Sequence, residues 1–223
     1  MKRGLLIIGT TSLLLLAACA KETTLKFDVT LRAPDASKAM VLAEAVERVM
    51  VRKMTAQNIE KPMVSVVPDG SGSAILTIDA PDENAADVVR TLVNEQFTFD
   101  LRIEDTVPSE QEDKFDPARW QPAGITGALV TWVQAVGNRE TNEIGIDLTF
   151  NETGRMRLKS IFTDNVGKNI GIFVRGLLVS KMNILNSDIG DTLSISGVPS
   201  AAIAEVFADD VDVGLLTTIR EIR

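Results

Sequence analysis

The residues that most often carry out chemistry in proteins are scarce in this sequence. Its 223 residues include one cysteine and no histidine. Without histidine, this sequence cannot form a Ser-His-Asp relay or a histidine-based metal pair. No serine has a lysine three residues later, there is no G-x-S-x-G, and Gly167-Lys168 lacks the flanking residues of a phosphate loop. We therefore expect no enzyme activity, and we assign no catalytic, cofactor-binding or metal-binding residue.

Three groups of carboxylates and one glycine-rich stretch remain as candidates for a ligand site. The carboxylates lie at 110–113, 188–191 and 209–212, and none has the spacing of an EF-hand calcium loop. Solvated turns are the favoured interpretation, with weak calcium binding as the alternative. The stretch "PDGSGS" at 68–73 lies between two strand patterns, so Asp69-Gly70 predicts a hairpin turn rather than a phosphate cradle.

The single cysteine directly follows the most apolar run of the sequence. Lys2 and Arg3 precede that run, which is interrupted and shorter than the roughly 20 residues of a membrane span. A basic start, an apolar middle and small residues at the end are typical of a cleaved signal peptide. The ending Leu16-Ala17-Ala18-Cys19 resembles the lipobox of bacterial lipoproteins. An ordinary signal, an uncut anchor and a buried cysteine are the alternatives.

The lipoprotein resemblance implies a signal peptide at 1–18, lipid on Cys19 and a tether at 19–24. The protein would then be anchored to the membrane of a bacterial cell envelope and face an extracytoplasmic space. If the cell has two membranes, the residues after Cys19 slightly favour the outer one. Loss of Lys2 and Arg3 would make the net charge more negative than −8. Such a surface repels phosphate backbones, so we expect no nucleic-acid partner.

Hydrophobic periodicity predicts a first module over 25–105. Alternating apolar residues indicate strands, and apolar residues at steps of three and four indicate helices. The strands are expected at 25–31, 63–67, 74–79 and 97–103, and the helices from 35 to 54 and from 82 onward. The order βαββαβ is that of a ferredoxin-like sandwich.

A second series of elements follows a stretch rich in proline and charge. Residues 106–123 are expected to form a linker, with Trp120 packed where the chain enters the next module. The second module, at 124–208, has strand patterns at 129–136, 144–150, 170–175, 178–184 and 191–197, a helix capped by Asn151 or Thr153, and a short helix at 199–208. Alternation from Val211 to Ile219 predicts a closing strand within 209–223.

The stretch "IDLTFNETGRMRLKSIFTDNVGKNIGIFVRG" at 146–176, followed by "LSISG" at 193–197, resembles the first periplasmic domain of SecD, a subunit of the bacterial protein-export machinery. The segment "GITGALV" at 124–130 also resembles the opening of that family's head subdomain. The likeness extends more faintly over 25–223. It implies an α+β fold in which a head is inserted into a ferredoxin-like base, and the strand at 209–223 returns to complete the base.

The same resemblance implies a function in protein export. In that family the head engages translocating polypeptide, and a proton-driven membrane half powers the movement. We expect this protein to lack that membrane half, so a translocase role would need a partner in trans. We expect an accessory polypeptide-binding module in protein export or envelope folding. The alternative is a structural envelope component that docks onto a membrane complex without binding client chains.

One departure from the family pattern suggests a contact surface. The family commonly has Asp-Gly and a polar residue at a hairpin turn, where this sequence has Arg175-Gly176 followed by Leu177 and Leu178. A leucine at a tight turn is expected to be exposed. Arg175, Gly176, Leu177 and Leu178 are therefore our predicted partner-contact residues, with incidental exposure or local packing as the alternative.

Overall fold

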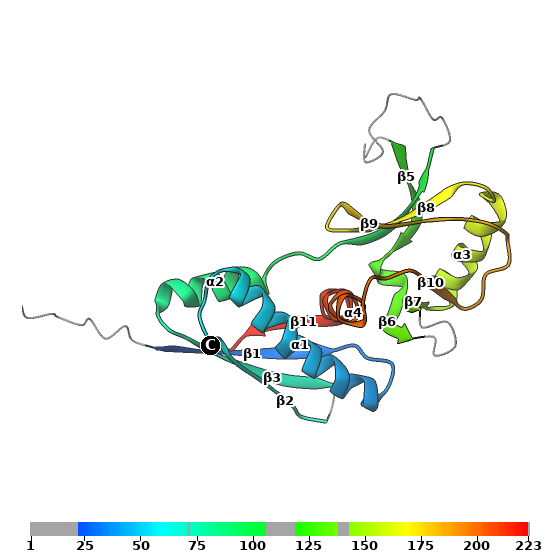
Figure 1. Ribbon diagram of the computed structural model, residues 1–223. Helices are drawn as coiled ribbons and strands as arrows, with labels where there is room; N and C mark the ends of the chain where they lie inside the picture. The colour runs from blue at the N-terminus through cyan, green and yellow to red at the C-terminus, as the bar shows by residue number, and fades with distance from the viewer. Residues whose placement is uncertain (1–21, 71, 106–118, 138–142, 223) are drawn as a thin grey trace, which may run out of the picture.

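The computed structural model describes residues 22–70, 72–105, 119–137 and 143–222. Cys19, the signal peptide and most of the predicted linker lie outside these residues. The described chain forms antiparallel sheets and helices, which confirms the predicted α+β class. None of the described helices is long and apolar enough to span a membrane. Figure 1 shows two modules, which we call the base and the head, with helix α4 between them.

The base contains β1 (Thr23–Leu31), α1 (Ala36–Ala56), β2 (Met63–Pro68), β3 (Ser73–Ala80) and α2 (Glu83–Val93). Alternate residues of β1 are buried, as its sequence pattern predicts. Asp35 and Asp82 cap the two helices by accepting backbone N–H groups of Lys38 and Ala85. These five elements confirm the strands and helices that we expected up to residue 93. The predicted turn at Asp69-Gly70 joins β2 to β3.

The strand predicted at 97–103 is present but belongs to the other module, so the base does not extend to residue 105. This strand, β4 (Phe99–Glu104), pairs with β5 (Trp120–Thr126) and β8 (Asn169–Val174) in the head. The base sheet instead has the order β11-β1-β3-β2, and β11 (Thr217–Glu221) occupies the edge beside β1. Alternation identifies a half-buried strand but not its partner, and Phe99 and Leu101 are buried in the head core.

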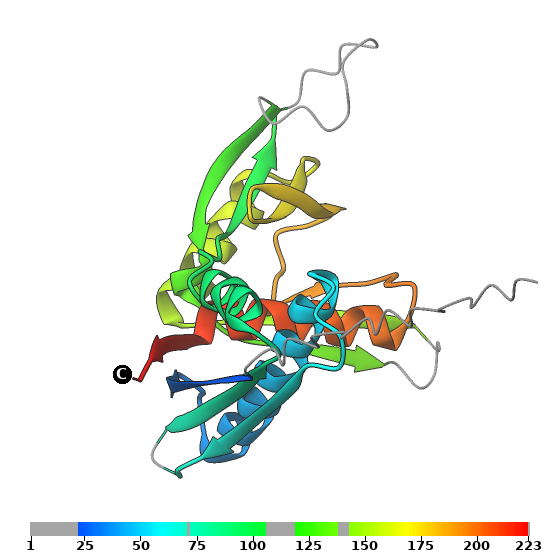
Figure 2. The same cartoon turned by 90° about the vertical axis from the view of Figure 1, so that its left-hand side faces the viewer.

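The head is built from two sheets and one helix. The first sheet has the order β5-β4-β8-β9, where β9 is Leu177–Asn183. The second has the order β10-β7-β6, from Thr192–Ile195, Ile144–Phe150 and Val130–Gly137. Helix α3 (Glu152–Asp164) begins after Asn151, the first of its two predicted caps, and a short 3-10 turn (Gly127–Leu129) precedes β6. These elements share one apolar core, and Figure 2 shows the head rising away from the base.

Two boundary predictions around the head were wrong. Residues 120–123, which we assigned to the linker, belong to β5, because Trp120 packs edge-on against Phe173 at 5.4 Å between ring centroids. This packing confirms the expectation that Trp120 is buried where the chain enters the head. The predicted closing strand starts too early, because α4 (Ala201–Leu216) continues past residue 208. Ala204, Ala208 and Val211 are spaced as one helix face and are buried together, which outweighs the alternation at 211–215.

Candidate functional site

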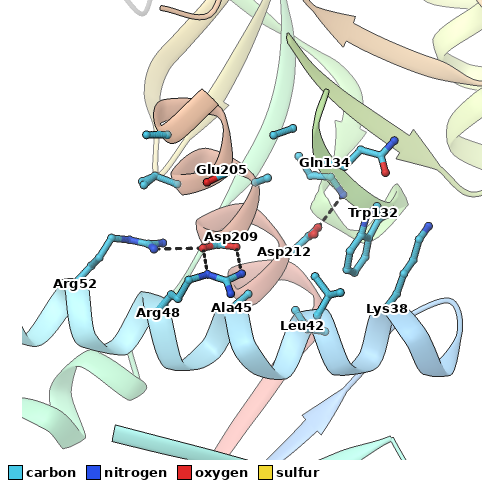
Figure 3. Close-up of a pocket in the computed structure, with 16 residues that line it drawn as sticks. Lys38, Leu42, Ala45, Arg48, Arg52, Trp132, Gln134, Glu205, Asp209 and Asp212 are labelled. Atoms are coloured by element: carbon cyan, nitrogen blue, oxygen red, sulfur yellow. Dashed lines mark hydrogen bonds and ion pairs between the residues drawn. The ribbon is translucent and has the colours of Figure 1, made fainter. Parts of the chain in front are cut away.

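A groove of about 800 Å³ lies where the base meets the head, between α1, α4 and β6. Figure 3 shows α1 along one side of the groove, with α4 and β6 above it. The helix residues of the groove recur at steps of three and four, so each helix presents one face to it. The lining residues are Lys38, Val41, Leu42, Ala45, Arg48 and Arg52 of α1, Trp132 to Ala135 of β6, and Ala202, Glu205, Val206, Ala208, Asp209 and Asp212 of α4.

The walls of the groove are mainly apolar and partly open to solvent. Val41 of α1 is 46% exposed, and Val206 of α4 is 40% exposed. Trp132 is buried, and Figure 3 shows its ring between β6 and α1, with the Lys38 ammonium 5.0 Å from the ring centroid. Exposed apolar side chains around a hollow are typical of a binding surface.

Strand β6 joins the two cores. Successive side chains of a strand point to opposite faces, so Trp132 points to one side and Val133 to the other. Trp132 belongs to the apolar cluster of the base, and Val133 to that of the head. The groove therefore forms only when both modules are in place.

One edge of β6 has no strand partner among the described residues. β6 pairs with β7, and no second described strand lies on its other side. The backbone N–H of Val133 points to this free side, because it donates to Oδ1 of Asp212 at 2.8 Å. Hydrogen-bonding direction alternates along an antiparallel pair, so Ala135 and Gly137 present their N–H and C=O groups on the same side. These groups can pair with another extended chain.

Ion pairs hold α1 and α4 together beside the groove. Arg48 binds Asp209 through two hydrogen bonds of 2.9 and 2.8 Å. Arg52 contacts Asp209 at 3.2 Å and Asp210 at 2.7 Å. The hydrogen bond with Asp209 is the main reason that the pKa of Arg48 is raised above its ordinary value. Because Asp209 is bound by both arginines, these charges position the helices rather than remain free for a ligand.

Asp212 is the unusual titratable group of the groove. Its side chain lines the groove although the residue is only 4% exposed. Burial raises the pKa of Asp212 to about 8, and the charge of Asp209 adds to this effect. The hydrogen bond from Val133 and the charge of Lys38 act in the opposite direction. A buried carboxyl group of this kind is frequent at functional sites.

The four predicted contact residues lie elsewhere, at the tip of the hairpin between β8 and β9. Leu177 is 71% exposed, as its position at the turn predicts. Arg175 is not free: it pairs with Glu95 at 3.1 Å, and its guanidinium lies 5.5 Å from the Phe97 ring centroid. The tip is thus docked on the connection between base and head. None of the four residues lines the groove.

Sequence reasoning missed the groove and misassigned its carboxylates. We expected 209–212 to be a solvated turn, but these residues lie within α4. Asp209 is held by arginines of α1 and Asp212 is buried, because the helix turns both toward neighbouring elements. The available signal was the position of Asp212 between Val211 and Val213, which places a carboxylate inside an apolar pattern.

Comparison with known proteins supports the observed fold. The chain resembles a solved structure of SecDF, a translocon-associated membrane protein from Thermus thermophilus, with a TM-score of 0.52 and 16% identity over 88% of this chain. A structure of SecDF in a super-membrane-facing form gives a TM-score of 0.50 and 16% identity over 91% of this chain. This chain spans 30% of the length of each of those chains. At such identities the likeness concerns the fold alone. No curated protein matches the sequence.

A family model provides the stronger assignment. The model described as the P1 head subdomain of SecDF matches residues 104–217, about half of the chain. The match includes β5 to β10, α3 and all of α4, so it covers two of the three walls of the groove. The chain therefore belongs to the SecDF P1 head subdomain family.

Proposed function

We propose that this protein is an extracytoplasmic binding module for extended polypeptide, acting as an accessory component in protein export or envelope folding. The open edge of β6 inside an apolar groove is the observation that carries the proposal. An extended peptide can add a strand to such an edge, and nearby pockets then accept its alternate side chains. The family assignment supports an export context, since its solved members include a translocon-associated membrane protein.

A proline on the free edge tests the binding mode. Ala135→Pro removes an N–H that points away from β7, so the sheet should persist while strand addition is blocked. We expect an unfolded, carboxymethylated polypeptide to bind the full chain in mild detergent. The affinity should fall at least about tenfold in the variant. Ala135→Val keeps the N–H and is the matched control. Equal binding by Ala135→Pro, with an unchanged melting temperature, would reject β6 as the docking edge.

Attachment through Cys19 is the second part of the proposal. It rests on the lipobox-like Leu16-Ala17-Ala18-Cys19. Two or more lipid chains would hold the protein stably on a membrane, with the outer membrane slightly favoured in a cell that has two. Cys19→Ser should yield an uncut or soluble form without lipid mass on the N-terminal peptide. If wild-type protein carries no lipid and fractionates as the variant does, the anchoring proposal is wrong.

Docking onto a membrane complex without client binding is the alternative function. The exposed side chains of Leu177 and Val179 on edge strand β9 favour it. Such a component should form a stoichiometric complex with one subunit and show no affinity for unfolded polypeptide. A photo-crosslinker at Leu177 distinguishes the functions, because capture of one membrane subunit supports docking and capture of many exported chains supports client binding.

A further inference from the structure

One oxygen of the Asp212 carboxyl group has a hydrogen-bond partner in the part of the chain that the structure describes, and the other does not. Its Oδ1 accepts the N–H of Val133 at 2.8 Å. Among the described residues, no group donates a hydrogen bond to its other oxygen, Oδ2. Oδ2 is not fully buried, because Asp212 lines the groove and the buried side-chain atoms without a partner among the described residues are Nε of Arg119 and Nε1 of Trp120. The side chain therefore has capacity for one further hydrogen bond.

Among the described residues, no cation forms an ion pair with Asp212. Arg48 and Arg52 of α1 are bound by Asp209 and Asp210. Lys38 of α1 attracts Asp212 electrostatically, but its ammonium lies over Trp132. Asp209 is the acidic group whose charge raises the pKa of Asp212. Glu205 also lines the groove, Asp210 lies on the same helix, and Asp147 of β7 accepts a hydrogen bond from Ser194. β6 itself has no titratable side chain. Burial among these groups disfavours the ionised form.

A neutral carboxylic acid offers the same hydrogen-bonding pair as a peptide group. Its C=O accepts and its O–H donates, so it can receive the N–H of Val133 and also donate to another carbonyl. Val133 and Ala135 lie two residues apart on the free side of β6, a separation of about 6.8 Å, which is the repeat of a strand ladder. Asp212 thus occupies the place where a neighbouring strand would bond to Val133.

We propose that neutral Asp212 is a binding residue that donates its proton in a hydrogen bond to a backbone carbonyl of polypeptide added along β6. The substrate class is then extended backbone, recognised without regard to the charge of its side chains. This inference rests on the proposed function, because it specifies how the same groove holds its polypeptide. Ala135 and Gly137 would continue the ladder through their own N–H and C=O groups.

The pH dependence of binding tests this proposal. A short capped peptide of alternating valine and glutamine is a suitable probe because it has no ionisable group. With the pKa of Asp212 at about 8, the proton is present below that pH and lost above it. The affinity of the full chain should therefore be about tenfold weaker at about pH 9 than at about pH 7.

Asp212→Asn is the matched variant. Its amide keeps an acceptor for Val133 and supplies a permanent N–H donor. We expect the variant to bind the peptide at about pH 7 as tightly as wild type, and to keep that affinity at about pH 9. A wild-type affinity that rises with pH, or a loss of binding in Asp212→Asn, would show that an ionised carboxylate binds the substrate and would overturn the proposal.

Two further measurements separate the possible failures. If wild type binds the probe equally at both pH values while Ala135→Pro does not bind, the groove function stands and the role of Asp212 is rejected. If neither wild type nor Asp212→Asn binds the probe or the carboxymethylated polypeptide at any pH, the proposed function itself fails. Circular dichroism at each pH checks that every variant remains folded.

Discussion

The free edges of β6 and β9 differ in their surroundings. β6 runs beside two helices, its residues 132–135 line an apolar groove, and the N–H of Val133 donates to the buried carboxyl group of Asp212. β9 lies on the surface of the head, where Leu177 and Val179 are exposed and Lys181 reaches Glu104 at 3.5 Å. A charged lysine on an edge strand discourages further pairing. Hydrogen bonds in a desolvated groove are also stronger than those in water. The comparison therefore predicts that partial burial is a better guide to a binding edge than exposure alone.

The largest expected effect concerns the buried carboxyl group beside β6. Burial raises the folded-state pKa of Asp212 to about 8. The unfolded chain ionises at about pH 4, so the folded state loses stability relative to it as pH rises from about 4 to about 8. Asp212→Asn removes this cost. The variant should be more stable than wild type by roughly 2 to 4 kcal/mol above about pH 8, and by much less at about pH 4. Urea unfolding at several pH values measures the difference, and a constant difference would contradict the prediction.

A smaller effect is expected at the ion pairs that flank the groove. Asp209→Asn removes the carboxylate that both Arg48 and Arg52 contact. The pairs are partly exposed, so we expect a loss of roughly 1 kcal/mol in unfolding free energy. Peptide affinity should also fall, because α1 and α4 would be held less closely. Asp210→Asn, which affects Arg52 alone, is the control and should have the weaker effect.

The docked end of the β9 hairpin should tolerate change better. Arg175→Ala removes the ion pair with Glu95 and the contact with Phe97. Both partners are partly exposed, so the loss of stability should be below about 1 kcal/mol. Peptide binding in the groove should remain as in wild type. A large loss of binding would show that the hairpin tip controls how the head sits on the base.

The smallest effect is expected at the exposed leucine. Leu177→Asp should change the unfolding free energy by less than about 0.5 kcal/mol, because the side chain is 71% exposed. It should leave peptide binding in the groove unchanged and reduce any docking that uses β9. Thermal unfolding and the crosslinking assay report the two effects separately. Unfolding of the head by this substitution would mean that Leu177 is part of the core.

Most individual elements could be predicted from the sequence, because short-range patterns encode them. The alternation of Leu25, Phe27 and Val29 identified β1, and Asp35, Asp82 and Asn151 marked the starts of three helices. The exposure of Leu177 followed from turn chemistry alone. Each of these features depends on residues close together in the chain, so no knowledge of the fold was needed.

Strand partners and the groove could not be predicted in this way. By pattern, Phe99 and Leu101 fit the base or the head equally well. Because they pack in the head core, β11 occupies the edge of the base sheet beside β1. Residues 211–216 alternate like a strand, but packing against β6 and α1 keeps them in α4. Lys38, Trp132 and Asp212 are far apart in sequence and meet only when base and head assemble.

The sequence by itself determined which segments up to residue 93 are helices or strands. It also determined the positions of most head elements and the lipobox-like position of Cys19. Local backbone preference and apolar periodicity are sufficient for the elements. Only the tertiary structure decided that β6 has an open edge, that Asp212 is buried against it and that Arg175 is paired with Glu95 on the connection between base and head. Burial and long-range pairing change both the availability of a hydrogen bond and the pKa of a carboxyl group, and neither is encoded by neighbouring residues.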